Sequence, residues 1–323
     1  MPVSLSNLDL INSCDQFPYL DPSKPQEYFD HLNKYVHLRV VNQPRPEVTF
    51  GLIRPEVAEG IAKCEGWELD TNSTPSTLTL VAGSTADERN VVVDRSMRSL
   101  REARVFQVLD KWREELYTVY GVDKRELFAV ERSASPLLGV VTYGVHMTAY
   151  KRHPSGMRIW VPRRSAHKQT YPSMLDNTVA GGMAKGELPY EALIREASEE
   201  ADLPESLVRD RVVAVGAITY LYERDSQAGG ECGLLQPECQ YLYDMDLTDS
   251  GAECAPNDDE VESFKLMEVA AVKSALRNGE FKPNCAMVML DFLLRHGHIV
   301  MEDEPDYGEI VARLHRRLEF PMR

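Results

Sequence analysis

The chain has 323 residues, enough for two domains or one large one. It carries 36 basic and 51 acidic residues, a formal charge of −15, and its pI is near 5.1. This balance argues against a general nucleic-acid or anionic-membrane binder, which needs a net basic surface. Hydrophobic residues make up 43% and charged residues 27%, so wholesale disorder and collagen-like repeats are excluded.

The cysteines and the N-terminus indicate a reducing compartment. Six cysteines without CxxC spacing are too sparse for a disulfide scaffold and are interpreted as reduced thiols. The first residues lack a basic region followed by an apolar stretch, and the chain has no run of 18 apolar residues. We therefore expect a cytoplasmic protein without a membrane or nucleic-acid partner, and the nucleus is left open as a location.

The first half of the chain predicts a small α+β domain, residues 1–125. In chain order we expect a helix at 25–35, strands at 48–53 and 77–81, and one or two helices within 95–120. No catalytic constellation is recognisable in this half.

The second half, residues 126–323, predicts a mixed sheet with helices. Segments rich in β-branched and aromatic residues predict strands at 138–150, 157–162, 212–222, 240–247 and 263–266. Helices are expected at 189–201, 267–278, 283–297 and 305–318. Because strands and helices do not alternate regularly, the fold class is α+β or an α/β sandwich rather than a doubly wound sheet.

Three carboxylates gather on one face of the predicted helix 189–201. Glu196, Glu199 and Glu200 are spaced i, i+3 and i+4, which places them side by side. A solvated acidic face is the commoner explanation for such a run. The alternative is a site for Mg²⁺, which takes carboxylate and water ligands and bridges to substrate phosphates.

The residues before this helix favour the metal site. Gly181, Gly182 and Gly186 predict a turn where backbone approaches a ligand, followed by Glu187 and, within the helix, Arg195. The spacing G-x5-E-x7-R-E-U-x-E-E resembles the Nudix box, the signature of hydrolases that cleave diphosphates linked to another moiety. The sequence departs from this pattern at Asp202, where the family has a late glycine. Asp tolerates left-handed backbone, so we expect the helix end to be kept.

The resemblance implies a Nudix α/β/α sandwich with a mixed sheet, preceded by a smaller α+β domain. It implies Mg²⁺ or Mn²⁺ as cofactor, held by Glu196, Glu199 and Glu200. The general base would be Glu199, Glu200 or a residue on a later loop, where Glu260 is the candidate, and Glu187 and Arg195 would pair. Further assignments are the backbone carbonyl near Ala180 and Glu260 as additional metal ligands, and Arg163, Arg164, Lys168, Gly181 and Gly182 as substrate-binding residues. The bases belong to segment 131–180, which holds seven bases and two acids.

A longer resemblance concerns the substrate. The strings VHMTAY and IWVPRRSAHKQTYPSMLDNTVAGG, with the box, resemble the Nudix half of fungal thiamine pyrophosphokinase proteins and their stand-alone relatives. The string ELYTVYG and the segment after it resemble the domain of unknown function that precedes Nudix in that group. This implies hydrolysis of oxidised thiamine diphosphates, such as oxothiamine and oxythiamine diphosphate, to monophosphates. We expect residues 1–125 to form part of the wall around the organic moiety.

Other functions remain open. The box handles only the diphosphate, so ADP-ribose or another nucleoside diphosphate derivative is an alternative substrate. An isopentenyl diphosphate isomerase would need a cysteine in the site, and no Cys occurs from 65 to 231. A non-catalytic binding module would be expected to lose glutamates of the box, which are all present here. A homodimer is left open.

Overall fold

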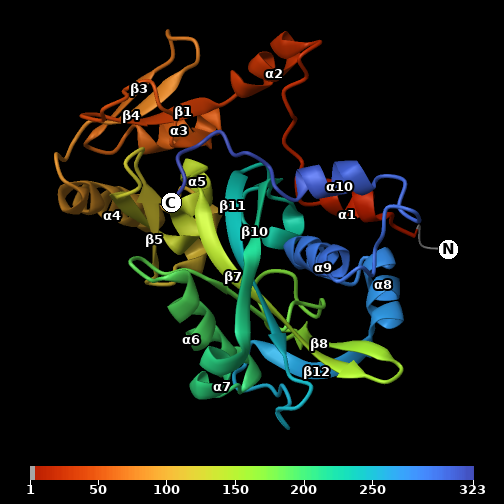
Figure 1. Cartoon of the computed structure of the whole chain (residues 1–323). Coiled ribbons are helices and arrows are strands. Elements are labelled where there is room, and N and C mark those ends of the chain that lie inside the picture. The colour runs from red at the N-terminus through yellow and green to blue at the C-terminus, as the bar shows by residue number, and fades with distance from the viewer. Residues whose placement is uncertain (1–3) are drawn as a thin grey trace.

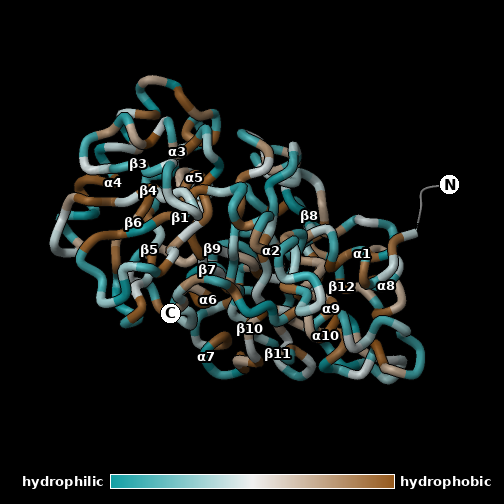
Figure 2. Tube along the Cα trace, turned by 90° about the horizontal axis from the view of Figure 1, so that it is seen from above, coloured by the Kyte–Doolittle hydropathy of each residue, from teal (hydrophilic) through white to brown (hydrophobic). Residues whose placement is uncertain are grey.

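The computed structural model describes residues 4–323 and has two sheet-based lobes (Figures 1 and 2). The N-terminal lobe is a four-stranded sheet in the order β2-β1-β4-β3, packed with helices α3 and α4. Only β1 and β4 run parallel. The elements are β1 Val36–Val40, β2 Gly51–Ile53, α3 Pro55–Ile61, β3 Trp67–Asp70, β4 Thr77–Leu80 and α4 Ala86–Glu102.

The main lobe is built on a six-stranded mixed sheet. Its order is β10-β11-β7-β8-β12, and β9 pairs with β7. Strands β7 and β11 are parallel, and the remaining pairs are antiparallel. The strands are β7 Thr142–His153, β8 Gly156–Arg164, β9 Val179–Gly182, β10 Val212–Glu223, β11 Leu235–Asp246 and β12 Val261–Glu268.

Helices cover both faces of this sheet, so the predicted α/β/α sandwich is confirmed (Figure 1). Along β7, Val145 and Met147 point to one face, where they share a buried cluster with α6. On the other face, α9 is buried along most of its surface, as an apolar helix requires. The first face carries α6 Pro189–Ala201 and α7 Glu205–Arg211; the second carries α1 Asn7–Asn12, α8 Val269–Arg277, α9 Pro283–Arg295 and α10 Tyr307–Arg313.

A hairpin connects the two lobes. Strands β5 (Leu116–Tyr120) and β6 (Glu126–Glu131) pair with each other, α4 packs against β6, and β5 contacts β7. The short helix α5 (Ser135–Leu138) follows and ends at Gly139, whose φ is 58°. The domain boundary drawn from the sequence, between residues 125 and 126, falls in the turn of this hairpin.

The prediction of one or two helices within 95–120 is confirmed, because this stretch holds the end of helix α4 and a short 3-10 helix, although its last residues form strand β5. Helix α4 begins earlier, at a capping box formed by Thr85 and Glu88, and ends at Glu102. Arg104 then adopts a positive φ of 52°, which turns the chain away from the helix axis. The following residues form the short helix η1 (Gln107–Lys111) and then β5, whose β-branched and aromatic side chains pair with β6.

Most other predicted elements are confirmed with shifted ends. Helix 189–201 has the expected limits, whereas the strand expected at 138–150 begins only at Thr142, because α5 precedes it. Strand β11 begins five residues before the predicted 240. Helix α2 (Pro25–Leu32) and helix α10 are shorter than expected. Within residues 4–323, no helix combines the length and apolar character needed to cross a membrane.

Candidate active site

Helix α6 presents the predicted carboxylates beside strand β9. Pro189 occupies its first turn, and Leu188 makes no side-chain cap. Asp202 ends the helix with φ 53° and ψ 35°, the left-handed conformation expected where the family pattern has glycine. Gly181 and Gly182 lie in β9, paired with β7, and not in a turn as expected from the sequence. Gly186, with φ 79°, makes the turn that follows.

Arg195 joins the loop before the helix to the carboxylates on it. Its Nε and Nη2 donate to the two Glu187 oxygens at 2.9 and 3.1 Å, so the predicted pair is present and bidentate. Its Nη1 donates to Glu196 at 2.8 Å and to Glu199 at 3.2 Å. Glu187 also accepts the N–H of Ala184, which fixes the loop on α6.

Burial controls the ionisation of two of the three helix carboxylates. Glu200 is 8% exposed, and burial, followed by the charges of Glu196 and Asp176, raises its pKa to about 8. Burial also raises the pKa of Glu196, against the charges of Arg195 and Arg132. Glu199 is the most exposed of the three. Repulsion among close carboxylates is what a bound cation would relieve.

The backbone of β9 completes the surroundings of these carboxylates. The N–H of Ala180 donates to Glu200 at 2.9 Å instead of to its ladder neighbour His146. In an antiparallel ladder the N–H and C=O of one residue point to the same side, so the Ala180 carbonyl also faces α6. A Cβ at Gly181 would lie 2.0 Å from the Glu196 carboxyl carbon. Only glycine therefore allows this carboxylate against the strand.

The donor set fits a hard divalent cation such as Mg²⁺ or Mn²⁺. Carboxylate and carbonyl oxygens are the ligands these ions prefer. In residues 4–323, however, no three His, Cys, Asp or Glu side chains are placed together as a metal-binding group. Glu196 and Glu199 are held by Arg195, and Glu200 by the Ala180 amide. The residue types suit the ion, and the side chains would have to exchange these partners to bind it.

The three bases predicted to bind substrate are each occupied by partners within the protein. Arg164 is buried, and its guanidinium donates to Asp176 at 2.6 Å and to two backbone carbonyls, so its role is structural. Arg163 donates to the Ser173 carbonyl at 2.6 Å. Lys168 pairs with Glu260, and burial, followed by the Arg164 charge, lowers the pKa of Lys168 to about 8. Lys168 and Glu200 influence each other's pKa, so Lys168 and Glu260 lie toward the carboxylates.

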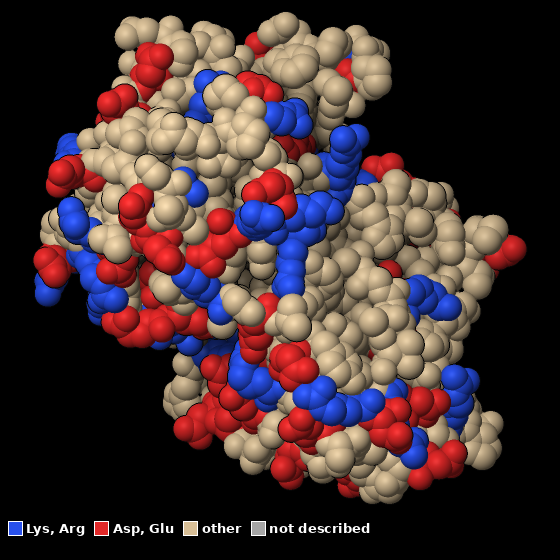
Figure 3. All heavy atoms as spheres, turned by 60° about the vertical axis from the view of Figure 1, so that its left-hand side comes forward, with Lys and Arg blue, Asp and Glu red and all other residues tan. Residues whose placement is uncertain are grey.

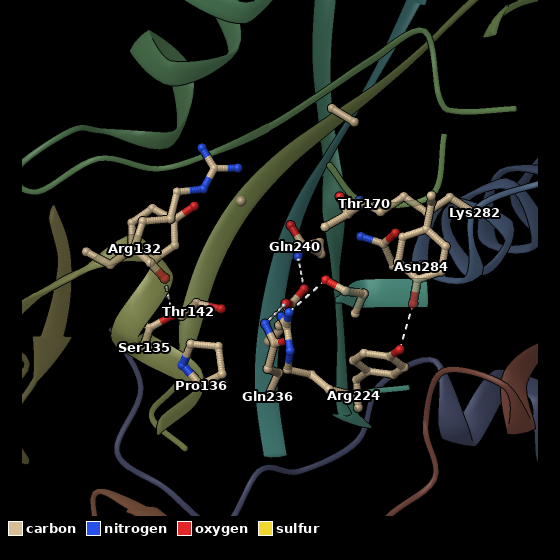
Figure 4. A pocket seen from close by; sticks show the side chains of 18 of the residues that line it. Arg132, Ser135, Pro136, Thr142, Thr170, Arg224, Gln236, Gln240, Lys282 and Asn284 are labelled. Atoms are coloured by element: carbon tan, nitrogen blue, oxygen red, sulfur yellow. Dashed lines mark hydrogen bonds between the residues drawn. The ribbon is translucent and has the colours of Figure 1, made fainter. Parts of the chain in front are cut away.

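A cavity of about 250 Å³ begins at β9 and extends between the hairpin and the main sheet (Figure 4). Its lining, drawn from residues 4–323, contains none of Arg163, Arg164 and Lys168. Basic and acidic side chains gather where the N-terminal lobe meets the rest of the molecule, around a hollow in the surface (Figure 3). The basic lining residues are Lys111, Arg113, Arg132, Arg224 and Lys282. The aromatic ones are Tyr117, Tyr143, Tyr171, Tyr220 and Tyr222.

Arg132 is the cavity base that reaches the carboxylate helix. It pairs with Glu115 at 2.8 Å, and its guanidinium lies 5.6 Å from the centre of the Tyr117 ring. Its positive charge opposes the rise in the pKa of Glu196 that burial causes. The sequence placed it within the basic segment without assigning it a role. Lys111, Arg113 and Tyr117 come from the first 125 residues, so the N-terminal half contributes to the wall of this cavity. That this wall surrounds the organic moiety of a substrate stays a prediction.

The raised pKa of Glu200 gives a stability prediction for the metal-free protein. Its ordinary pKa is 4.5, so the folded state binds this proton more tightly than the unfolded state, and wild-type stability falls as pH rises from 4.5 to about 8. Glu200→Gln does not titrate and can still accept from Ala180. At pH 8 the raised pKa costs the wild type several kcal/mol of unfolding free energy. Each 1 kcal/mol corresponds to about 2–4 °C in Tm. We therefore expect the Tm of the variant in EDTA at pH 8 to exceed that of the wild type by roughly 5 °C or more.

Thermal unfolding of both proteins across pH 4.5 to 8.5 measures this difference. The gap in Tm should grow with pH and level off above 8. A constant gap would show that burial does not act on this carboxylate as described.

Comparison with known proteins identifies the family. Residues 44–142 match the model of a domain of unknown function, DUF4743, and residues 142–285 match the NUDIX domain. The uncharacterized protein YJR142W of Saccharomyces cerevisiae is 42% identical over 241 residues, covering 73% of this chain and 70% of that protein. Nudix hydrolase 20 and Nudix hydrolase 24 of Arabidopsis thaliana, both named chloroplastic, are 38% and 34% identical over 64% and 62% of this chain. The chain spans 53% of each plant protein.

With the box residues arranged on α6 and β9 as described, the chain belongs to the Nudix hydrolase family, in the arrangement in which a DUF4743 domain precedes the Nudix domain.

Proposed function

We propose that the protein uses Mg²⁺ or Mn²⁺ to hydrolyse a diphosphate linked to a compact organic group, and that its substrates are oxidised thiamine diphosphates. One observation carries this proposal: the cavity lined by tyrosines begins at Gly181 and Gly182, beside the carboxylates of α6. A substrate can thus place its diphosphate at the helix and its organic ring in the cavity.

The chain's own residues would divide the chemistry as follows. Glu196, Glu199, Glu200 and the Ala180 carbonyl would hold the cation, with Glu260 as a further ligand candidate. A cation bound there supplies neutralisation of the diphosphate oxygens and a lower pKa for water. Arg195 positions Glu187, Glu196 and Glu199 through its hydrogen bonds. Glu199 and Glu200 are the candidates for the general base.

The reaction breaks one phosphoric anhydride bond. Water attacks phosphorus, its proton passes to the base, and the products are the organic monophosphate and inorganic phosphate. We place Arg132 at the diphosphate, because it lines the cavity and its positive charge favours the ionised form of Glu196. It would take the role that the sequence assigned to Arg163, Arg164 and Lys168.

The size of the cavity supports a compact organic group. Its volume of about 250 Å³ lies below the roughly 300–1,000 Å³ of typical ligand pockets, which disfavours dinucleoside polyphosphates. Tyrosine side chains can stack on a heteroaromatic ring. The resemblance to the thiamine pyrophosphokinase-related group supports a thiamine-like ring. The cytoplasm stays the predicted location, and a homodimer stays open.

Steady-state kinetics with Mg²⁺ on oxothiamine diphosphate, thiamine diphosphate, ADP-ribose and 8-oxo-dGTP test the substrate assignment. We expect the highest kcat/KM for oxothiamine diphosphate, because the basic side chains that line the cavity repel the thiazolium cation of thiamine diphosphate and do not repel an uncharged ring. A higher kcat/KM for ADP-ribose would reject the thiamine assignment and leave the hydrolase assignment standing.

A further inference from the structure

The lining of the cavity carries more positive than negative charge. Among residues 4–323 it contains five Lys or Arg side chains and one carboxylate, that of Glu238. Glu238 already accepts hydrogen bonds from three uncharged donors: the Tyr220 hydroxyl, Gln240 Nε2 at 2.7 Å and Gln236 Nε2 at 3.3 Å. Most of the acceptor capacity of this carboxylate is therefore used within the protein. The excess of positive charge favours a ligand group that accepts hydrogen bonds.

One of the five bases, Lys282, differs from the others. The other four donate hydrogen bonds to protein groups: Lys111, Arg113, Arg132 and Arg224. In the part of the chain that the structure describes, the Lys282 ammonium forms neither a hydrogen bond nor an ion pair. An ammonium group carries three N–H donors, so all three are open to a ligand in the cavity.

The Lys282 ammonium lies toward the interior of the cavity. Lys282 immediately precedes α9 and lines the cavity together with Asn284. Burial lowers the pKa of the lining residue His146 to about 4, and the Lys282 charge lowers it further. Burial raises the pKa of Cys14, another lining residue, and the Lys282 charge opposes that rise. Figure 4 shows Lys282 and Arg132 on opposite sides of the cavity.

We propose that Lys282 selects oxidised thiamine diphosphates by donating a hydrogen bond to the ring oxo group that distinguishes them from thiamine diphosphate. This inference rests on the proposed function. The oxo group is on the thiazole ring in oxothiamine and on the pyrimidine in oxythiamine, and both ring positions adjoin the methylene bridge that joins the two rings. A donor placed beside this bridge can therefore reach either one. A substrate with its diphosphate at Arg132 would extend its rings across the cavity, toward Lys282.

Oxythiamine diphosphate and thiamine diphosphate form a matched pair of probes. They differ at one pyrimidine position, where the first carries an oxo group and the second an amino group. Both keep the thiazolium charge, so the comparison isolates the hydrogen bond. The ammonium donates to the oxo group, whereas the amino group places a second donor against it. We expect wild-type protein to bind oxythiamine diphosphate about ten-fold more tightly or more, in line with a hydrogen bond from a charged group.

Calorimetric titration of the full chain without metal measures both affinities in the absence of turnover. Lys282→Met removes the charged donor and keeps a long side chain, so the two affinities should differ less than about three-fold. Lys282→Gln, whose amide can donate as well as accept, gives the same readout if the Met variant loses its thermal transition. Lys265→Met, at an exposed position of β12, is the control and should keep the wild-type preference.

The outcomes separate this inference from the proposed function. Absence of a preference in wild type, or a preference unchanged in both Lys282 variants, overturns the inference. A wild-type preference for thiamine diphosphate also overturns it, because the amino group would then lie against the Glu238 carboxylate and not against Lys282. A preference for oxythiamine diphosphate that is lost in the variants supports the inference, even if neither diphosphate is cleaved with Mg²⁺. That last result would reject the proposed function alone.

Discussion

Replacing Glu196, Glu199 or Glu200 by Gln should lower kcat roughly 100-fold or more. Residues that only support a metal ligand typically cost 10–100-fold when changed, so a direct ligand should cost at least as much. Each substitution removes charge and keeps volume. The measurement is the rate of phosphate release from oxothiamine diphosphate at saturating Mg²⁺, together with the Tm of each variant.

Glu191→Gln is the matched control on the same helix. Glu191 is exposed and pairs with Arg209, away from the cavity. Its substitution should leave kcat within a factor of about two, since exposed ion pairs contribute little. Near wild-type turnover in all three box variants would remove the metal site from the account.

Arg132→Ala should lower kcat/KM for diphosphates about 10- to 100-fold. The loss corresponds to a charged hydrogen bond of roughly 1.5–3 kcal/mol. Arg132→Lys keeps the charge and should recover part of the loss, although Lys cannot bind in the bidentate way of Arg. Steady-state kinetics of both variants on oxothiamine diphosphate provide the test.

Arg163 and Arg164 serve as controls for this assignment. Arg163→Ala should have wild-type kinetics, because Arg163 lies outside the cavity. Arg164→Ala should lower the free energy of unfolding by about 3–5 kcal/mol, since it leaves the buried Asp176 carboxylate without its partner. If Arg163→Ala, and not Arg132→Ala, lowered kcat/KM, the sequence assignment would be the correct one.

Local signals predicted helix α6 well. Proline at the first turn, the spacing of the glutamates and the tolerance of Asp202 for left-handed backbone all act within a few residues of one another. The limits of α6 therefore followed from the sequence, whereas the Glu187–Arg195 pair was implied by the resemblance to the Nudix box. The same holds for strands with strong β-branched or aromatic patterns.

Contacts between distant segments could not be predicted in this way. Segment 131–180 is basic by count, but acids later in the chain neutralise it: Asp246 pairs with Arg152, Glu268 with Arg158, and Glu260 with Lys168. Charge counted along the chain thus overstated the positive field of this segment.

The cavity residues illustrate what the sequence did and did not contain. Arg132 lies before the Nudix domain and reaches the box only because the hairpin packs against β7. For Glu238 a signal was present. The run QPECQ alternates polar residues on one face, and extending the predicted strand back from 240 would have placed Gln236 and Glu238 beside Gln240.

Metal-dependent cleavage of oxothiamine diphosphate by the full chain is the most direct test of the account. Phosphate release and the organic product would be followed with Mg²⁺, after addition of excess EDTA, and after Mg²⁺ is restored. We expect equal amounts of the monophosphate and inorganic phosphate with Mg²⁺, no turnover in EDTA, and recovery when the metal is returned. Undiminished turnover in EDTA, or no cleavage with either Mg²⁺ or Mn²⁺, would contradict the account.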